Sequence, residues 1–362
     1  MPVLACRDLA VSYGEVDVLS GLDLEVAAGE TVALLGPSGS GKTTLLYAVA
    51  GFVSPSAGRI DIAGVTVSGR GRRPVPAEDR EVGLVFQNYA LWPHLTALET
   101  VAYPVRRRGV ERSTAERRAR ELLALMGIGE LGHRKPDQLS GGQQQRVGLA
   151  RALAREARLY LMDEPTAHLD AALRAALQRE IAAVRERTGA AAVYATHDAG
   201  EALAVADRVA LLRGGRLVQV GAPEEVYSQP VDRWAAELTG VASVLDVAVD
   251  DVDRKSLEIE VAGVSLRVGV AEVREGSRAR LLVRPEWVSF GSEGAPGTVE
   301  HVAFRGPHTE YRLSTPGGEL VARQDGRARF HVGDSLTWQL REAWWLPPDE
   351  REPTVRTGRD RT

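Results

Sequence analysis

The spacing of apolar and polar residues divides the chain into two regions with different patterns. From Val3 to about Val220, short apolar runs such as Val32–Leu35 and Leu159–Met162 alternate with segments of helical spacing. Strands that alternate with helices are typical of a parallel sheet covered by helices. The pattern therefore predicts an α/β domain with a largely parallel sheet in the first region.

A mainly helical insert interrupts this alternation. Arg106 to Leu125 is rich in charged residues, alanine and leucine at helical spacing, and a second helical run, Gln144 to Ala154, follows Ser140. We expect a helical subdomain at about 88–157.

The pattern changes again near Gly240. Short alternating runs, such as Leu257–Val261 and Ser265–Val268, are separated by glycine turns, which is typical of a small all-β barrel. The similar strand content of 244–290 and 299–346 suggests two halves of one compact domain. We expect domains at 1–236 and 237–348, followed by a polar, disordered tail at 349–362.

Composition places the chain among ordinary globular proteins. It has 362 residues, 44% of them hydrophobic, a net charge of −4 and one cysteine, Cys6, so an internal disulfide is excluded. No apolar run approaches the length of a membrane span, and the N-terminus lacks the pattern of a signal peptide, which predicts a cytoplasmic location. The balanced charge makes neither nucleic acid nor anionic lipid an obvious partner.

The segment Gly36–Thr43 joins an apolar run to a helical run and reads Gly-Pro-Ser-Gly-Ser-Gly-Lys-Thr. Glycines let backbone N–H groups approach phosphate oxygens, and the N-terminus of the following helix presents positive charge to the same group. We expect Lys42 to reach the β- and γ-phosphates and Thr43 to bind Mg²⁺. The segment predicts a nucleoside triphosphatase; the alternative is a glycine-rich turn without a ligand.

The rarity of lysine argues against that alternative. Of 45 lysine and arginine residues, only Lys42, Lys135 and Lys255 are lysine. Arginine therefore serves nearly wherever a positive charge suffices, whereas the loop carries a compact ammonium group. This choice favours phosphate binding.

Two carboxylates end the apolar run Leu159–Met162 and form the expected partner of the loop. We expect Asp163 to hold Mg²⁺ and Glu164 to polarise the attacking water. The alternative is a pair of helix-capping acids.

The segment Leu139–Gln143 reads Leu-Ser-Gly-Gly-Gln. Ser140 and Gln143 have the spacing of a capping box, so a simple helix start is one interpretation. The two adjacent glycines, however, expose the amides of the first helical turn, which form an anion receptor. A chain with two phosphate receptors is expected to offer the second one to the nucleotide of a neighbour.

With these motifs in this order, the chain resembles the ATP-binding cassette (ABC) family over nearly its whole length. The resemblance implies an α/β fold, a P-loop NTPase cassette with a helical subdomain, followed by a small all-β OB-like (TOBE) barrel. It also implies two cofactors, ATP and Mg²⁺, and a head-to-tail homodimer that holds each ATP between the P-loop of one copy and the signature of the other.

The resemblance assigns site residues by position. Tyr13 matches the aromatic residue that stacks on adenine, Gln87 the glutamine that senses Mg²⁺ and the attacking water, and His197 the histidine that contacts the γ-phosphate and orients the catalytic glutamate. Catalytic roles are implied for Glu164, His197 and Gln87; metal contacts for Thr43, Gln87 and Asp163; and nucleotide contacts for Tyr13, Gly36, Pro37, Ser38, Gly39, Ser40, Gly41, Lys42, Thr43, Thr44, Ser140, Gly141, Gly142, Gln143 and Asp170.

One segment departs from the family pattern. Where the family commonly has Ser-Ala-Leu-Asp, this chain has Ala167-His168-Leu169-Asp170. The loss of a hydroxyl and the gain of a titratable ring change the hydrogen bonding expected at the dimer seam. An exposed His168 without a role is the simpler interpretation.

The resemblance also implies partners. Residues 88–95, which include Leu91 and Trp92, are expected to contact separate membrane permease subunits at the cytoplasmic face of the inner membrane, with an extracytoplasmic solute-binding protein as an indirect partner. Arg284-Pro285-Glu286 resembles a segment of the barrel found in bacterial importer ATPases for sugars, polyamines, quaternary amines, iron(III), phosphonates and oxyanions. We expect Trp338, Trp344 and Trp345 to pack in the core of this barrel rather than to line a ligand site.

The alternative function is a non-transport ABC ATPase of the translation or DNA-repair type. A repair ATPase needs a long coiled coil between Lys42 and Ser140, and no sustained heptad occurs there. A translation factor of this family carries two cassettes, whereas each motif occurs once here. An importer ATPase is the function that the sequence favours.

Overall fold

The structure is a computed structural model that describes residues 1–86, 89–166, 174, 179, 189–253, 256–270 and 278–347, and only the backbone at 250–253. The chain forms two compact units, Met1–Pro223 and the part from Glu224 onward. None of the helices in the described part combines the length and apolar character that a bilayer-spanning segment needs.

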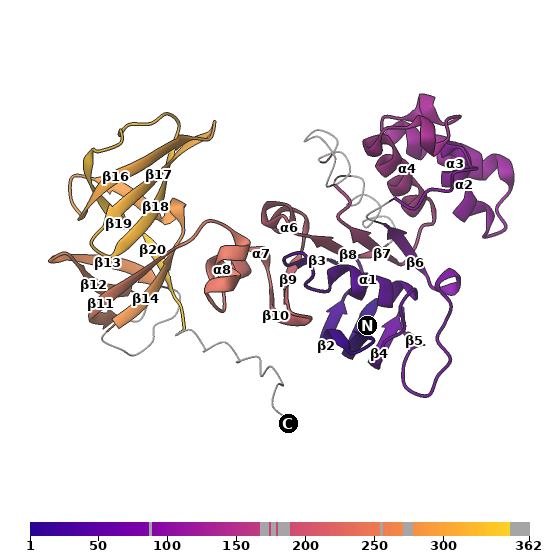
Figure 1. Cartoon of the computed structure of the whole chain (residues 1–362), viewed down its shortest axis with the longest axis horizontal. Coiled ribbons are helices and arrows are strands. Elements are labelled where there is room, and N and C mark those ends of the chain that lie inside the picture. Colours follow the sequence, from indigo (N-terminus) through magenta and orange to yellow (C-terminus); the bar gives the residue numbers. More distant parts are fainter. Residues whose placement is uncertain are drawn as a thin grey trace, which may run out of the picture. The chain divides into compact units, whose positions relative to one another are not determined.

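A six-stranded sheet forms the centre of the first unit (Figure 1). Five neighbouring strands are parallel, and the edge strand β10 is antiparallel, as the alternating pattern predicted. In spatial order, the strands are β10 (Arg216–Gly221), β9 (Arg208–Arg213), β3 (Thr31–Leu35), β8 (Ala191–Thr196), β7 (Leu159–Asp163) and β6 (Val82–Val85).

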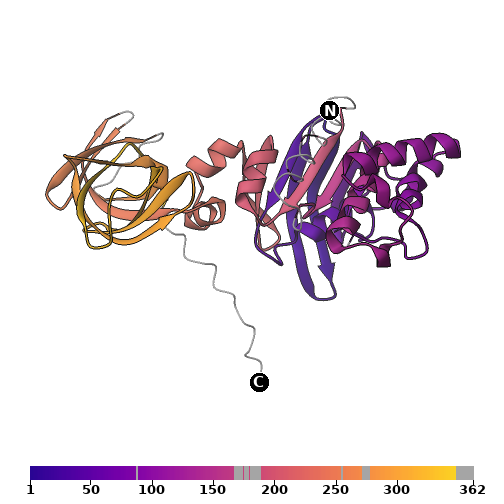
Figure 2. The same cartoon turned by 90° about the horizontal axis from the view of Figure 1, so that it is seen from above.

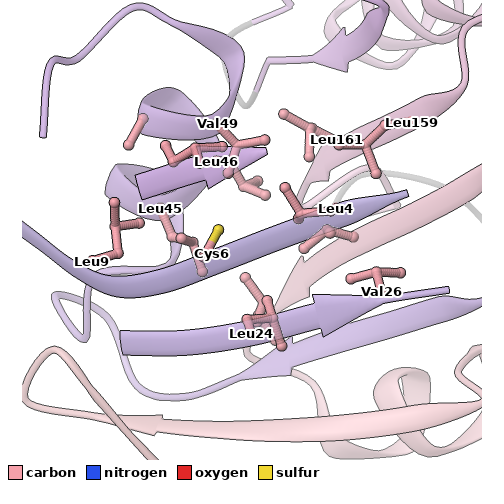
Figure 3. Packing of buried hydrophobic residues seen from close by; sticks show 14 of the residues in the cluster. Leu4, Cys6, Leu9, Leu24, Val26, Leu45, Leu46, Val49, Leu159 and Leu161 are labelled. Carbon is pink, nitrogen blue, oxygen red and sulfur yellow. The ribbon is translucent and has the colours of Figure 1, made fainter. Parts of the chain in front are cut away.

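A second, antiparallel sheet was not distinguished in the sequence. Its order is β2 (Val16–Val26), β1 (Leu4–Tyr13), β4 (Ala57–Ile62) and β5 (Val65–Ser68). Helix α1 (Lys42–Ala50) contributes to the core of both sheets: Figure 3 shows its Leu45, Leu46 and Val49 among buried side chains from β1, β2 and β7. The helix that follows the phosphate loop is thus fixed by apolar packing on its buried face.

Three helices form a group in the first unit that shares a core with one side of β6, β7 and β8. They are α2 (Ala97–Arg106), α3 (Arg112–Leu125) and α4 (Gly141–Ala154), and Figure 2 shows them, in purple, gathered at one side of the sheets. The helical spacing expected from Arg106 to Leu125 is interrupted after Arg106, where α2 ends, and resumes at Arg112. The shorter elements of the unit are η1 (Ala77–Asp79), η2 (Gly129–Leu131), η3 (Pro136–Gln138) and α6 (Ala199–Val205).

The second unit contains the predicted barrel and a further sheet. The closed barrel has the order β11 (Ser243–Asp253), β12 (Ser256–Val261), β13 (Val264–Val270), β20 (Glu342–Trp345) and β14 (Arg278–Val283). The sheet has the order β15 (Val288–Gly291), β19 (Ser335–Leu340), β16 (Ala295–Phe304), β17 (His308–Thr315) and β18 (Gly318–Asp325). The two parts share one core, in which Trp338 and Trp345 are buried as expected, whereas Trp344 is buried in a smaller cluster with Ala236, Leu282 and Leu346.

The unit is not built from two sequential halves, because β20, near the end of the described chain, closes the barrel between β13 and β14. It also includes two helices, α7 (Pro223–Ser228) and α8 (Arg233–Thr239), which the sequence placed with the first domain. The division lies at Pro223 rather than at 236 because the buried Arg284, just before η4 (Pro285–Trp287), binds backbone groups of the helical segment. The tail expected at 349–362 lies outside the described residues.

Candidate active site

The phosphate loop follows β3 and leads directly into α1. At Gly36 a Cβ would lie 2.4 Å from the carbonyl oxygen of Leu212 and 2.7 Å from Ser40 Oγ, so no larger residue fits there. Gly41, the N-cap of α1, has a φ of 106°, which favours glycine. These two glycines allow the tight turn that directs the N-terminus of α1 into the loop.

The side chain of Lys42 folds back into this loop. Its Nζ donates to the carbonyl oxygens of Gly36 at 2.7 Å and Pro37 at 3.0 Å. Burial lowers the pKa of Lys42, while the charges of Glu164 and Asp163 raise it. The ammonium group is therefore held inside the loop where a phosphate would enter.

Asp163 and two hydroxyl groups offer a set of oxygen ligands. Burial raises the pKa of Asp163, and a hydrogen bond from Thr43 counteracts this effect. Asp163 Oδ2 and Ser40 Oγ are buried without a hydrogen-bond partner in the described part of the chain. Because hard cations such as Mg²⁺ prefer carboxylate and hydroxyl oxygens, these residues fit a magnesium ion.

Glu164 and His197 form a hydrogen-bonded pair beside this set. His197 Nδ1 and Glu164 Oε1 are 2.8 Å apart, and the Glu164 N–H donates to the carbonyl oxygen of Ala195 at 2.9 Å. Glu164 has a φ of 47°, an uncommon value for a residue other than glycine, and such strain often occurs at functional sites. The turn after β7 thus directs this carboxylate toward the residue that follows β8.

Three parallel strands bring these groups to one edge of the sheet. β8 lies between β3 and β7, with Leu35 paired to Thr196 and Asp163 paired to Ala195. The loop after β3, the acids at the end of β7 and His197 after β8 are therefore neighbours, and ligands of α/β sheets bind at this carboxyl edge.

The signature segment lies in the helical group rather than beside the loop. α4 packs against α2, α3 and β6, whereas α1 packs against β7 and β8. Ser140 caps α4 and forms the predicted capping box with Gln143. Ser140 and Gly141 are exposed, and Gly142 and Gln143 are half-buried. The N-terminus of α4 is therefore open to an anion from outside this chain.

Most of the remaining predicted site residues are exposed or half-buried, and the others lie outside the described residues. Tyr13, at the end of β1, is 51% exposed, so its ring is free to stack on a base. Pro37, Ser38 and Gly39 are exposed on the loop and Thr44 is half-buried. Gln87, Asp170 and the unusual pair Ala167-His168 lie outside the described residues.

A groove of about 670 Å³ lies between β6 and the helical group. Its aromatic lining is Phe52, Phe86, Trp92 and Tyr103, with ring centroids 4.8 Å apart for the last two. Of the expected contact segment, Trp92 lines the groove, whereas Leu91 packs against the core of the helical group. An aromatic groove of this kind suits the side chains of a partner helix.

Sequence reasoning missed two arginines that shape these features. Arg80 donates to the carbonyl oxygens of Ala48 and Val49, at 2.9 and 2.6 Å, and so closes the C-terminal end of α1. Arg151 on α4 donates to the carbonyl oxygens of Tyr89 and Ala90, at 3.0 and 2.6 Å, and so fixes one wall of the groove. Nothing in the sequence distinguishes them from the other arginines.

Comparison with known proteins identifies two families along the chain. The ABC transporter family matches residues 19–167, and the TOBE domain matches residues 281–346. The Fe(3+) ions import ATP-binding protein FbpC of Brucella abortus (strain 2308) is 43% identical over 317 residues, 87% of this chain and 88% of that protein. The putrescine transport ATP-binding protein PotG of Escherichia coli (strain K12) is 36% identical over 355 residues, 95% of this chain and 93% of that protein.

A solved structure shows the same similarity in three dimensions. The dimeric post-hydrolysis structure of the ATP-binding cassette MJ0796 bound to ADP and Pi has 31% identity and a TM-score of 0.57, over 61% of this chain and 98% of that chain. The chain therefore belongs to the ABC transporter family, among the importer ATP-binding subunits that carry a C-terminal TOBE domain.

Proposed function

We propose that this chain is the ATPase subunit of a bacterial iron(III) importer, in which two copies bind and hydrolyse Mg-ATP and thereby drive separate permease subunits. The observation that carries the proposal is the meeting of Lys42, Asp163, Glu164 and His197 at the carboxyl edge of β3, β8 and β7. A phosphate receptor, a metal ligand and a hydrogen-bonded carboxylate–histidine pair are the groups that phosphoryl transfer to water requires.

The described residues divide the chemistry among them. Lys42 and the N-terminal amides of α1 bind the phosphates, and Thr43 and Asp163 hold Mg²⁺, which neutralises developing charge when bound. Glu164 accepts the proton of the attacking water, and His197 orients Glu164 through the 2.8 Å contact. Glu164 is 19% exposed at its side chain and His197 is 60% exposed, so the pair is open to an entering nucleotide.

A second copy of the chain completes the site in this proposal. The capped N-terminus of α4 exposes Ser140 and Gly141 and packs with α2, α3 and β6 rather than with α1. An anion receptor turned to solvent is suited to the γ-phosphate bound by another copy. The dimeric MJ0796 cassette supports this assembly. Cleavage of the γ-phosphate would then remove the bridge between the copies and let them separate.

The groove lined by Trp92 and Tyr103 is the proposed binding site for the permease subunits. Its aromatic walls provide apolar area for a partner helix, and Arg151, 5.4 Å from the ring centroid of Trp92, holds that wall in place. With permease subunits seated there, the chain would act as a peripheral protein on the cytoplasmic face of the inner membrane.

Iron(III) is the proposed cargo because the iron importers FbpC match this chain at up to 43% identity, compared with 36% for PotG. Putrescine is the second candidate, since PotG matches over 95% of the chain. The cargo is recognised by the binding protein and the permease, so its identity is tested in the complex rather than in this chain.

The test is uptake of radioactive iron(III) and of radioactive putrescine into vesicles that contain the chain with its permease subunits and binding protein. We expect ATP-dependent iron uptake, and loss of both uptake and ATP hydrolysis in Lys42→Ala, which lacks the loop ammonium group. ATP-dependent uptake of putrescine but not of iron would transfer the assignment to polyamines. A complex that hydrolyses ATP and moves neither solute would refute both cargo assignments.

A further inference from the structure

A buried cluster of hydroxyl groups around Glu201 lies next to the segments that carry Glu164 and His197. Glu201 is in the first turn of α6, four residues after His197, and is 8% exposed. Thr166, Tyr194 and Thr196 all donate their hydroxyl groups to its carboxylate, and each of these three residues is also buried. A buried carboxylate is costly unless hydrogen bonds satisfy it, so this geometry is strongly specified.

The cluster joins the two segments that carry the catalytic pair. Thr166 lies two residues after Glu164, in the turn that follows β7. Thr196 is the last residue of β8 and immediately precedes His197; its hydroxyl donates to Glu201 Oε2 at 2.7 Å. One carboxylate therefore binds a residue from each side of the Glu164–His197 contact.

Further hydrogen bonds fix the backbone on both sides of His197. The N–H of Asp198 donates to Thr196 Oγ1 at 3.0 Å, and Asp198 Oδ1 accepts from the N–H of Glu201 at 2.9 Å. The chain from Thr196 to Glu201 is thus closed into a small hydrogen-bonded ring. His197 projects from this ring toward Glu164, with most of its own side chain exposed.

Tyr194 adds to the rigidity of the cluster. Its hydroxyl lies 3.3 Å from the hydroxyl of Thr166 and donates to Glu201. Burial, followed by the charge of Glu201, raises the pKa of Tyr194, so the phenol keeps its proton and remains a donor at any working pH. The donors to the carboxylate are therefore hydroxyl groups that do not titrate.

We propose that Glu201 is a positioning residue for ATP hydrolysis: by binding Thr166 and Thr196 together, it sets the distance and orientation of His197 relative to Glu164. Glu201 itself does not touch the nucleotide. The inference rests on the proposed ATPase chemistry of Glu164 and His197. It adds the group that fixes the positions of these two residues relative to each other. Small displacements of reacting groups slow a reaction by large factors. Removal of the Glu201 carboxylate is therefore expected to lower kcat.

The main variants are Glu201→Gln, which weakens the cluster, and Thr196→Val, which removes one donor and keeps the shape of the side chain. We expect each to lower kcat for ATP hydrolysis by about 10-fold or more, with the Kd of ATP changed by less than about twofold. Thr196→Ser restores the hydroxyl and should restore kcat, which a loss of packing alone would not predict.

A matched control is available in the second unit. There the Tyr227 hydroxyl donates to Glu286 at 2.7 Å, which is the same type of bond between two residues of the second unit. Glu286→Gln should leave kcat unchanged. Thermal unfolding of every variant separates a loss of folded protein from a loss of rate.

A double-mutant cycle with His197→Ala distinguishes positioning from general structural support. In single-turnover hydrolysis of γ-³²P-ATP, which measures slow rates, Thr196→Val should have almost no further effect once His197 is absent. The same rate loss with and without His197, a loss of ATP affinity, or an unchanged kcat in Glu201→Gln would overturn the proposal. A wild-type chain that hydrolyses no ATP would instead refute the ATPase function itself.

Discussion

Arg284 is expected to be the main link between the helices α7 and α8 and the β-sheets of the second unit. Its fully buried guanidinium donates to the carbonyl oxygens of Tyr227, Ala236 and Val241 and to the hydroxyl of Thr239, at distances of 2.6–3.1 Å. The guanidinium carbon also lies 4.0 Å from the ring centroid of Tyr227. The substitution Arg284→Met removes all these contacts and keeps a long apolar side chain.

The expected cost follows from the acceptors that lose their donor. The carbonyl groups that lose this donor are buried at Ala236 and partly buried at Tyr227 and Val241, and such losses cost about 1–3 kcal/mol each. The cost of burying a charge is recovered when the charge is removed. We therefore expect a net loss of about 4 kcal/mol in the free energy of unfolding of this unit. For a unit of its size, this corresponds to a fall in Tm of roughly 10–20 °C.

Differential scanning calorimetry of the full chain measures this effect on the transition of the second unit. The control is Arg312→Met, because Arg312 pairs with Glu319 at 3.4 Å while both side chains are more than half exposed. Such surface pairs contribute about 1 kcal/mol or less, so the control should shift Tm by only a few degrees. If Arg284→Met unfolds at the same temperature as Arg312→Met, the inferred role of Arg284 is wrong.

Three further predictions concern the first unit. Glu164→Gln should keep ATP affinity but lower kcat by about 10²–10⁴-fold and accumulate an ATP-bound dimer in size-exclusion chromatography; normal turnover would exclude Glu164 as the base. Trp92→Asp should spare basal ATPase activity but abolish transport in the reconstituted complex, and undiminished transport would remove this groove from the permease interface. Burial raises the pKa of Cys6 from 9.0 to about 12, so its thiol should resist Ellman's reagent at pH 8 until the protein unfolds. Since the unfolded thiol ionises near pH 9 and the folded one near 12, this group should lower the free energy of unfolding as pH rises between these values; a pH-independent stability there would contradict the assignment.

Features encoded by contiguous residues were predictable from the sequence. The phosphate loop depends on glycines at positions 36, 39 and 41 and on the helix that begins at Lys42. The capping box depends on Ser140 and Gln143, three residues apart. Backbone conformation and local hydrogen bonds decide both features, so the pattern of residue types is sufficient. The largely parallel direction of the central strands was predictable from the alternation of strands and helices along the chain.

Contacts between distant residues needed the tertiary structure. Arg80 closes α1 through carbonyl groups more than 30 positions away, and Glu201 joins Thr166 to Thr196 across two strands. The entry of β20 into the barrel and the attachment of α8 through Arg284 also depend on long-range pairing. A buried charged side chain can form a hydrogen bond with any backbone carbonyl or hydroxyl group that the fold brings near it. The residues next to it in the sequence do not indicate which group that is.

The sequence by itself therefore predicted the chemistry proposed for this protein: a phosphate-binding loop, one carboxylate for a metal ion and one for catalysis, and a second anion receptor. The tertiary structure decided how these groups are held. It placed the ends of β3, β8 and β7 side by side, set His197 within hydrogen-bonding distance of Glu164, and put a buried carboxylate behind them. The reason is physical, because residue type defines what a group can bind, whereas distance and orientation arise from the packing of the whole chain.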